Sequence, residues 1–190
     1  LLEKAKEVMN GRQDKDGNTI DKGLSETIVT AKNMADPDAA VELYKNSWKS
    51  WKDNTKGTVS WMAKKKFENW MNKQSLKDIN SIKVSATTNM INNLRVNYAD
   101  KANVLAKQII YGETELIKKT ATTELNNFFN DAKTKEVFGD KLETVKKQVE
   151  RDIAFYGYKN VAVADQDEAL KMAVKDNRLE PKDIETLKKH

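Results

Sequence analysis

The chain has 190 residues, enough for one domain with a substantial core or for two small ones. Cysteine is absent, which excludes disulfides and thiolate metal sites. Apolar residues make up 38% and charged residues 33%, so the surface is large relative to the core, which favours an elongated helical shape. The sequence contains no apolar run as long as a membrane span or the core of a signal peptide.

The net charge of +5 is unevenly distributed along the chain. Between Lys45 and Lys77 there are nine lysines against two acids, Asp53 and Glu68. This window therefore has a local net charge of +7, and the rest of the chain carries about −2 by subtraction. The same window holds all four tryptophans of the chain. This coincidence of tryptophan and lysine is the one compositional anomaly in the sequence.

The first half of the chain reads as helices separated by polar turns. Residues 1–10 have helical apolar spacing, and because the chain starts inside this pattern without an initiator Met, we expect a fragment of a longer protein. The segment 11–23 predicts a loop or small hairpin around Asp16-Gly17. Helical spacing then resumes at Leu24. Asp36 is a good N-cap and Pro37 a good first residue for a helix that reaches about residue 54.

A basic helix is predicted from about residue 58 to 73. The sequence Ser75-Leu76-Lys77-Asp78 is typical of a capping box, so we expect a new helix to start there. It opens the longest periodic run of the chain, roughly nine turns or about 50 Å of helix. Gly112 marks its predicted end. The apolar positions of this run are Ile79, Ile82, Ala86, Met90, Leu94, Tyr98, Ala102, Leu105 and Ile109.

The remainder predicts further one-sided helices. A helix is expected over 117–128, followed by a turn over 133–140 around Gly139. The next apolar stripe runs over 142–156 and is expected to end at Gly157. Asp165 then predicts a capped helix over 165–177, and Pro181 a C-terminal helix.

These patterns predict an all-α fold, because no stretch alternates as a half-buried strand does. Each helix is apolar on one stripe only and needs a neighbour to cover it. We therefore expect an elongated bundle or array of antiparallel helical hairpins with one long central helix. The predicted division is an N-terminal segment over 1–74 and a long helix with a hairpin module over 75–190, or one continuous domain of a longer chain.

The stretch 161–187, VAVADQDEALKMAVKDNRLEPKDIETL, has a shortened echo at 34–44, MADPDAAVELY, with the same helix-start pattern. From about Ala99 onward the chain resembles a helical module of large virion proteins of tailed bacteriophages and prophages, in tail-associated or internal, ejected components. The resemblance rests on Gly112, Phe138-Gly139-Asp140, Asp165 to Ala169 and Leu179 to Asp183. It implies a helical segment without known functional residues.

Candidate chemistry in the sequence is sparse. Asp14-Lys15-Asp16-Gly17 resembles the start of a calcium loop, but Thr19 and Ser25 stand where an EF-hand has Gly and Glu, so an Asp-Gly turn is favoured. The one histidine, His190, is at the end of the chain. We therefore predict that the chain is not an enzyme, with no catalytic residue, cofactor, metal site or small-molecule substrate.

The aromatic and basic window suggests a contact surface. Its residues are Trp48, Trp51, Trp61, Lys64, Lys65, Lys66 and Trp70. Lysines could contact phosphates while aromatic rings stack on bases, or the segment could lie on an anionic membrane. Sequence-specific DNA reading is disfavoured because only four of the 34 basic residues are Arg. The favoured interpretation places the tryptophans in the core or at subunit contacts and the lysines on the solvated side.

The function expected from these observations is a non-catalytic structural or assembly segment of a phage or prophage virion protein. Its partners would be other virion proteins or copies of itself. Its location would be the phage particle, or the bacterial cytoplasm during assembly. The alternative is a basic-aromatic module that binds nucleic acid or anionic membrane through residues 45–77.

Overall fold

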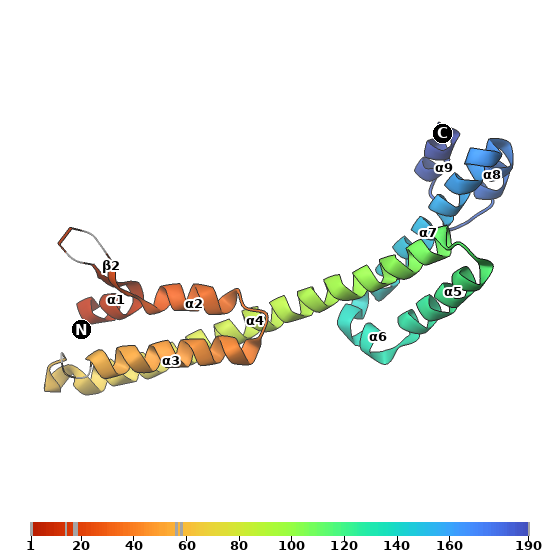
Figure 1. Cartoon of the computed structure of the whole chain (residues 1–190). Helices are drawn as coiled ribbons and strands as arrows, with labels where there is room; N and C mark the ends of the chain where they lie inside the picture. The colour runs from red at the N-terminus through yellow and green to blue at the C-terminus, as the bar shows by residue number, and fades with distance from the viewer. Residues whose placement is uncertain (1, 14, 17–18, 56, 58, 190) are drawn as a thin grey trace. The chain divides into compact units, whose positions relative to one another are not determined.

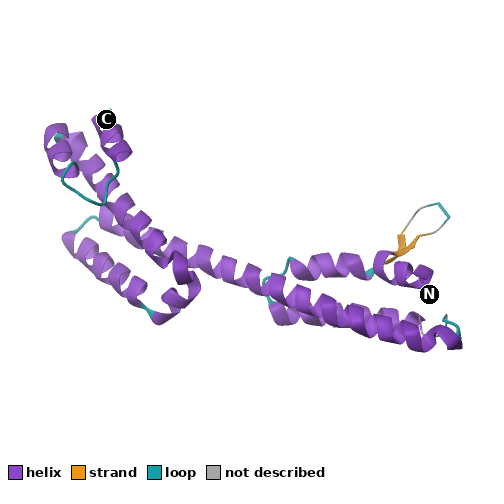
Figure 2. Cartoon of the chain, turned by 180° about the vertical axis from the view of Figure 1, so that it is seen from behind, coloured by secondary structure: helices purple, strands orange, loops and turns teal. Residues whose placement is uncertain are grey.

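The computed structural model describes residues 2–13, 15–16, 19–55, 57 and 59–189, with the backbone alone at 2, 13, 19–22, 61 and 62. The chain is all-α with one long helix, as predicted, and helices make up most of the described residues (Figure 2). It divides into two compact units, with the boundary between Asn93 and Leu94. We call these unit 1 and unit 2. The sequence instead predicts a division at 74/75, where a helix start is expected.

Unit 1 packs short N-terminal elements and a helical hairpin around one core (Figure 1). A small antiparallel β-hairpin, which pairs Arg12 with Asp21, follows the first helix, while Gly17 of the predicted turn lies outside the described residues. The helix boundaries agree with the predicted starts at Leu24 and Pro37. The elements are α1 (Leu2–Asn10), β1 (Gly11–Gln13), β2 (Thr19–Lys22), α2 (Leu24–Lys32), α3 (Pro37–Thr55) and the first part of α4 (Trp61–Tyr111).

Side-chain caps fix the junction between α2 and α3. The Asp36 carboxylate accepts hydrogen bonds from the backbone N–H groups of Asp38 and Ala39, both at 3.0 Å, as the predicted N-cap requires. The Asn89 amide on α4 donates to the Lys32 carbonyl at 2.8 Å and to the Met34 carbonyl at 3.3 Å. These carbonyls have no partner within the helix, so α4 completes the hydrogen bonding at the end of α2.

The helix α4 begins earlier than the sequence indicated. One continuous helix runs from Trp61 to Tyr111, so the helix start expected at Ser75 is wrong. Ser75 and Asp78 lie inside the helix and are buried, and the Asp78 carboxylate accepts a hydrogen bond from the Tyr44 hydroxyl at 2.8 Å. Ser75 and Asp78, which the sequence suggested as a helix cap, therefore belong to the packing between α3 and α4.

Unit 2 combines the end of α4 with the C-terminal helices. Its core joins Ala102 and Leu105 of α4 to Leu125 and Phe128 of α5 and to Val149 of α7. Tyr98 contacts this core through a tilted ring contact with Phe128. The elements are α5 (Glu115–Asn130), α6 (Ala132–Phe138), a 3-10 turn η1 (Gly139–Lys141), α7 (Leu142–Ala164), α8 (Gln166–Ala173) and α9 (Pro181–Lys188).

Two expected boundaries in unit 2 are wrong and two are right. The segment expected as a turn contains α6, because the Asp131 side chain caps a short helix before Gly139, whose φ of +56° ends it. The helix α7 continues through Gly157 to Ala164, where packing against α8 outweighs the helix-breaking tendency of glycine. The end of α4 before Gly112 and the cap at Asp165 are as predicted.

Candidate functional site

Three of the four predicted tryptophans belong to the core of unit 1. Trp51 is 8% exposed, and Trp48 and Trp70 are half-buried and pack against the same cluster of side chains. The fourth, Trp61, is the first residue of α4, and its side chain lies outside the described part of the chain. The indole rings of Trp48, Trp51 and Trp70 thus stabilise the packing of α3 against α4.

Polar and charged groups close this aromatic core. The Arg12 guanidinium lies over the Trp51 ring, 5.8 Å from its centroid, in a cation–π contact. Tyr44 is 1% exposed, and burial, with the Asp78 carboxylate next to it, raises the pKa of its hydroxyl well above its usual range. The Asp78 carboxylate also accepts a hydrogen bond from the Gln74 amide at 2.9 Å. These contacts are those of a packed interior.

The three predicted lysines are all exposed but do not share one face. Lys64 lines a small cavity together with Phe67 and Glu68, at the edge of the helix pair α3–α4. Lys66 is on the opposite, solvent-facing side of α4 by helical spacing, and Lys65 lies between it and Lys64 on the flank of the helix. The predicted contact surface is therefore divided between a packed aromatic side and a basic solvent side.

Lysines further along α4 continue this solvent side and were missed as site residues. Lys73, Lys77 and Lys83 are exposed; Lys73 and Lys77 share the side of Lys66 by helical spacing, whereas Lys83 is in line with Lys65. The sequence could have indicated two of them, because Lys73 and Lys77 lie within the basic window from Lys45 to Lys77. The grouping of lysines with tryptophans obscured that signal, since the rings and these lysines are on different sides of the same helix.

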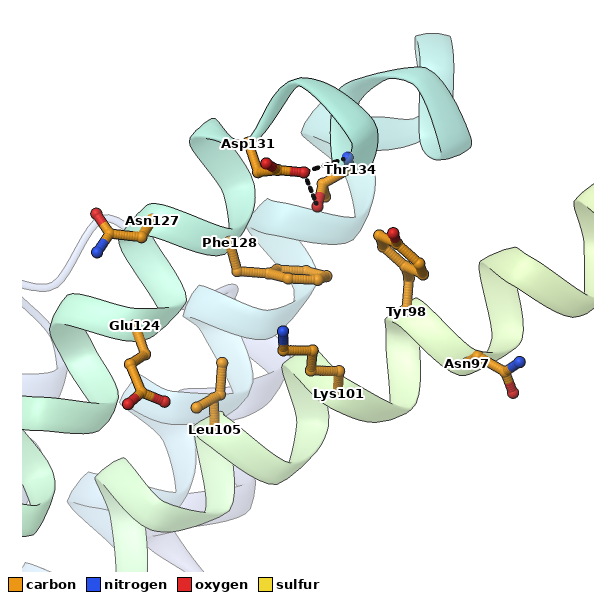
Figure 3. Close-up of a pocket in the computed structure, with 9 residues that line it drawn as sticks. All are labelled: Asn97, Tyr98, Lys101, Leu105, Glu124, Asn127, Phe128, Asp131 and Thr134. Atoms are coloured by element: carbon orange, nitrogen blue, oxygen red, sulfur yellow. Dashed lines mark hydrogen bonds between the residues drawn. The ribbon is translucent and has the colours of Figure 1, made fainter.

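Unit 2 holds an open groove of about 600 Å³ between α4, α5 and α6 (Figure 3). Its floor is apolar and its rim carries amides and charges. The Lys101 ammonium lies 5.6 Å from the centroid of the Phe128 ring, so the lysine stem covers part of the aromatic floor. The lining residues are Asn97, Tyr98, Lys101, Leu105, Glu124, Asn127, Phe128, Asp131 and Thr134.

The polar end of the groove is held by the Asp131 cap. Its carboxylate accepts a hydrogen bond from the Thr134 backbone N–H at 3.0 Å, drawn in Figure 3. This bond holds the pKa of Asp131 below its usual range. The carboxylate is therefore ionised at neutral pH and already engaged in ending one helix and starting the next.

A charged network fastens the C-terminal helices of unit 2. Arg151 on α7 donates two parallel hydrogen bonds to Asp183 on α9, both at 2.7 Å, and a third contact of 2.6 Å reaches Glu180. Asp183 also accepts from the Glu180 backbone N–H at 2.9 Å, which caps α9. The bonds from Arg151 lower the pKa of Asp183. No sequence pattern indicated this pairing.

A second network lies next to it. The Asp176 carboxylate accepts hydrogen bonds from the Tyr158 hydroxyl at 2.8 Å and from the Arg178 guanidinium, whose Nη2 is 2.6 Å away. These bonds, those from Arg178 first, hold the pKa of Asp176 well below its usual range. In both networks the charged side chains bind one another, and these contacts join α7 to the segment that follows it.

No group of three or more His, Asp or Glu side chains among the described residues is arranged to hold a metal ion. None of the helices, over the part of the chain that the structure describes, is both long and apolar enough to cross a membrane. Comparison with protein-family models, with curated proteins and with solved structures found no match to the chain.

Proposed function

We propose that this chain is a non-catalytic structural segment of a phage or prophage virion protein, which assembles with copies of itself or with neighbouring virion proteins. The biological setting rests on the resemblance of residues from Ala99 onward to the helical module of such proteins. The assembly role is supported by one observation in unit 2, an apolar face of α7 that is covered at one end and exposed at the other.

This face follows the heptad spacing of α7. Val149 is 4% exposed and belongs to the core of unit 2, and Ile153 packs against that core. Tyr156 and Val163 follow Val149 at intervals of seven residues and therefore lie on the same side of the helix. They are 40% and 87% exposed. Beyond the core, this side of α7 therefore carries two exposed apolar side chains, the partly covered Tyr156 and the largely uncovered Val163, with the exposed Asn160 between them.

An uncovered continuation of a core stripe is a favourable place for another helix to pack. Burial of a valine side chain contributes about 1.5–3 kcal/mol, and a tyrosine adds a larger apolar surface. The charged networks of Arg151 and Asp176 hold the neighbouring helices in place beside this stripe. The face is therefore presented on a rigid support.

Sedimentation velocity tests the assembly role. We expect the mean mass of the 190-residue chain to rise as its concentration is raised, and Val163→Glu to abolish this rise. The matched control is Leu116→Glu, because Leu116 is 75% exposed on α5 and its neighbours on the same side, Lys119, Thr120 and Thr123, are polar. A native chain that stays monomeric, or a Leu116 variant that loses assembly equally, would contradict the proposal.

The biological setting has its own test. The gene should lie among genes for tail or head proteins, and mass spectrometry of purified particles should detect the protein. A position within a metabolic operon, with no peptide in the particles, would count against the phage setting and leave the assembly role to be judged by sedimentation.

A further inference from the structure

The solvent face of α4 in unit 1 carries a row of lysines without acidic residues among them. Three exposed lysines, Lys66, Lys73 and Lys77, are in line opposite the side packed in the core, and Lys65 and Lys83 are in line with each other about a quarter turn away, on the same solvent-exposed half of the helix. We call this group of five the lysine face.

The two acids of this part of α4 do not neutralise the row. Asp78 is 8% exposed and engaged by Tyr44 and Gln74 in the core. Glu68 is half-buried and lines the cavity that Lys64 and Phe67 also line. Among the described residues, no lysine of the lysine face forms an ion pair. The five charges therefore add to a positive field along one side of the helix.

The lysine face has a defined length and a rigid support. From Lys66 to Lys83 the helix rises by about 26 Å, at about 1.5 Å per residue. The opposite side of the helix is fixed by the core, where Met71 and Ile82 are 3% and 0% exposed. The backbone positions of these lysines therefore keep a fixed spacing, while their flexible stems let the ammonium groups adjust.

We propose that the lysine face binds the phosphate backbone of double-stranded DNA without reading its sequence. A rigid helix that carries several ammonium groups on flexible stems can follow the phosphates of a stiff duplex, and lysine binds phosphate as a point charge. This binding goes beyond the assembly role and does not depend on it. It also differs from a module in which tryptophans stack on bases, because Trp51 and its neighbours are packed in the core.

A duplex fits this surface better than a single strand or a membrane. A single strand is bound through exposed aromatic rings, and the described side chains of the lysine face include none. A membrane-surface helix needs a broad apolar face, whereas among the described side chains only Leu76 and Val84 project between these lysines, at 65% and 67% exposure. The bulkier apolar side chains of this part of α4, such as Phe67, pack inwards.

The size of the electrostatic contribution can be predicted. Each phosphate neutralised on a duplex contributes about −0.9 to the slope of log K against log salt concentration. Five contacts give a slope of about −4.5, so the affinity should fall about 500-fold between about 50 and 200 mM salt. Loss of three lysines should reduce the slope to about −1.8 and the fall to about 12-fold.

The experiment is a salt titration of binding by fluorescence anisotropy, with the full chain and a labelled duplex of about 20 base pairs of arbitrary sequence. The test variant is Lys66→Gln/Lys73→Gln/Lys77→Gln. The control is Lys133→Gln/Lys135→Gln/Lys141→Gln, which removes the same charge from exposed positions of unit 2. Glutamine keeps helix propensity, and circular dichroism checks that both variants fold.

The expected result is the shallower slope for the first variant and an unchanged slope for the control. Equal slopes in the two variants, or no duplex binding by the native chain at the lowest salt concentration, would overturn the proposal. So would tighter binding to a single strand of the same length. Loss of binding to phosphatidylserine vesicles by the first variant, with duplex binding unchanged, would reassign the lysine face to membranes.

Discussion

Arg151 and Asp183 join α7 to α9 through two parallel hydrogen bonds, from Nε to Oδ2 and from Nη2 to Oδ1, each 2.7 Å long. The two side chains are only 16% and 12% exposed. A bidentate pair of this kind fixes both distance and orientation, which a lysine could not do.

Replacement of Arg151 by Lys should therefore loosen the C-terminal helices. The remaining ammonium cannot make both bonds, and Asp183 is left with an unsatisfied acceptor, at a cost of about 1–3 kcal/mol. Hydrogen exchange of the α8 and α9 amides measures the loss. The control is Lys182→Ala, because Lys182 pairs with Glu180 at the surface, where such pairs contribute less than about 1 kcal/mol. Equal effects of the two variants would contradict this role of Arg151.

Acid should weaken the same region. The pKa values of Asp183 and Asp176 are lowered in the folded chain by bonds from Arg151 and Arg178. The resulting stability is fully present above the unfolded-state pKa of about 3.9, and is lost as the pH falls below it. Hydrogen exchange of α8 and α9 at decreasing pH should show opening below about pH 4. The Asp183→Asn variant should lack the part of this pH dependence that comes from the Asp183 carboxylate. If the variant showed the same dependence of hydrogen exchange on pH as the native chain, the role assigned to Asp183 would be contradicted.

Alkali should act on unit 1 through Tyr44. Its pKa is raised by burial and by Asp78, so the contribution of Tyr44 is present below the unfolded-state pKa of about 10 and is lost above it. Ultraviolet titration should show one tyrosine that ionises only when tryptophan fluorescence reports unfolding of unit 1. Tyr44→Phe should remove this late step and destabilise unit 1 by about 1–3 kcal/mol, because Asp78 loses a buried donor. A Tyr44 that titrates with the exposed tyrosines would refute the prediction.

Two glycines should respond in opposite ways to alanine. A Cβ atom at Gly23 would lie 2.2 Å from the Met9 carbonyl oxygen, so Gly23→Ala forces backbone apart and should cost about 1–3 kcal/mol. At Gly157, inside α7, a Cβ would meet no atom within 4 Å apart from its chain neighbours and the adjacent backbone of its own helix. Gly157→Ala should stabilise the chain by about 0.5–1 kcal/mol. Urea denaturation of both variants measures the signs, and the same sign in both would contradict the prediction.

Local signals in the sequence predicted much of the fold. The caps at Asp36 and Asp165 and the stop at Gly112 depend on neighbouring residues only, and all three are at the expected places. The helix start predicted at Ser75 is wrong. A serine and an aspartate three residues apart also fit a helix interior when a partner such as Tyr44 binds one of them. The residues that surround Ser75 in the sequence do not reveal that Tyr44 is this partner.

The candidate site was less predictable, for a physical reason. On an amphipathic helix, aromatic and basic side chains alternate in sequence while they occupy opposite sides in space. Trp70 and Lys73 are close in sequence, yet the first packs in the core and the second is exposed. The pair of Arg151 and Asp183 is separated by 32 residues, a distance over which no local pattern operates.

The bond from Asn89 to the end of α2 also determines when α2 can complete its hydrogen bonding during synthesis. The carbonyl of Lys32 obtains its partner from a residue 57 positions later in the chain. A nascent chain released from the ribosome before Asn89 would lack this partner, and any proteolytic product that ends before it would have a frayed second helix. The end of α2 therefore obtains this hydrogen bond only after the chain has been made as far as Asn89.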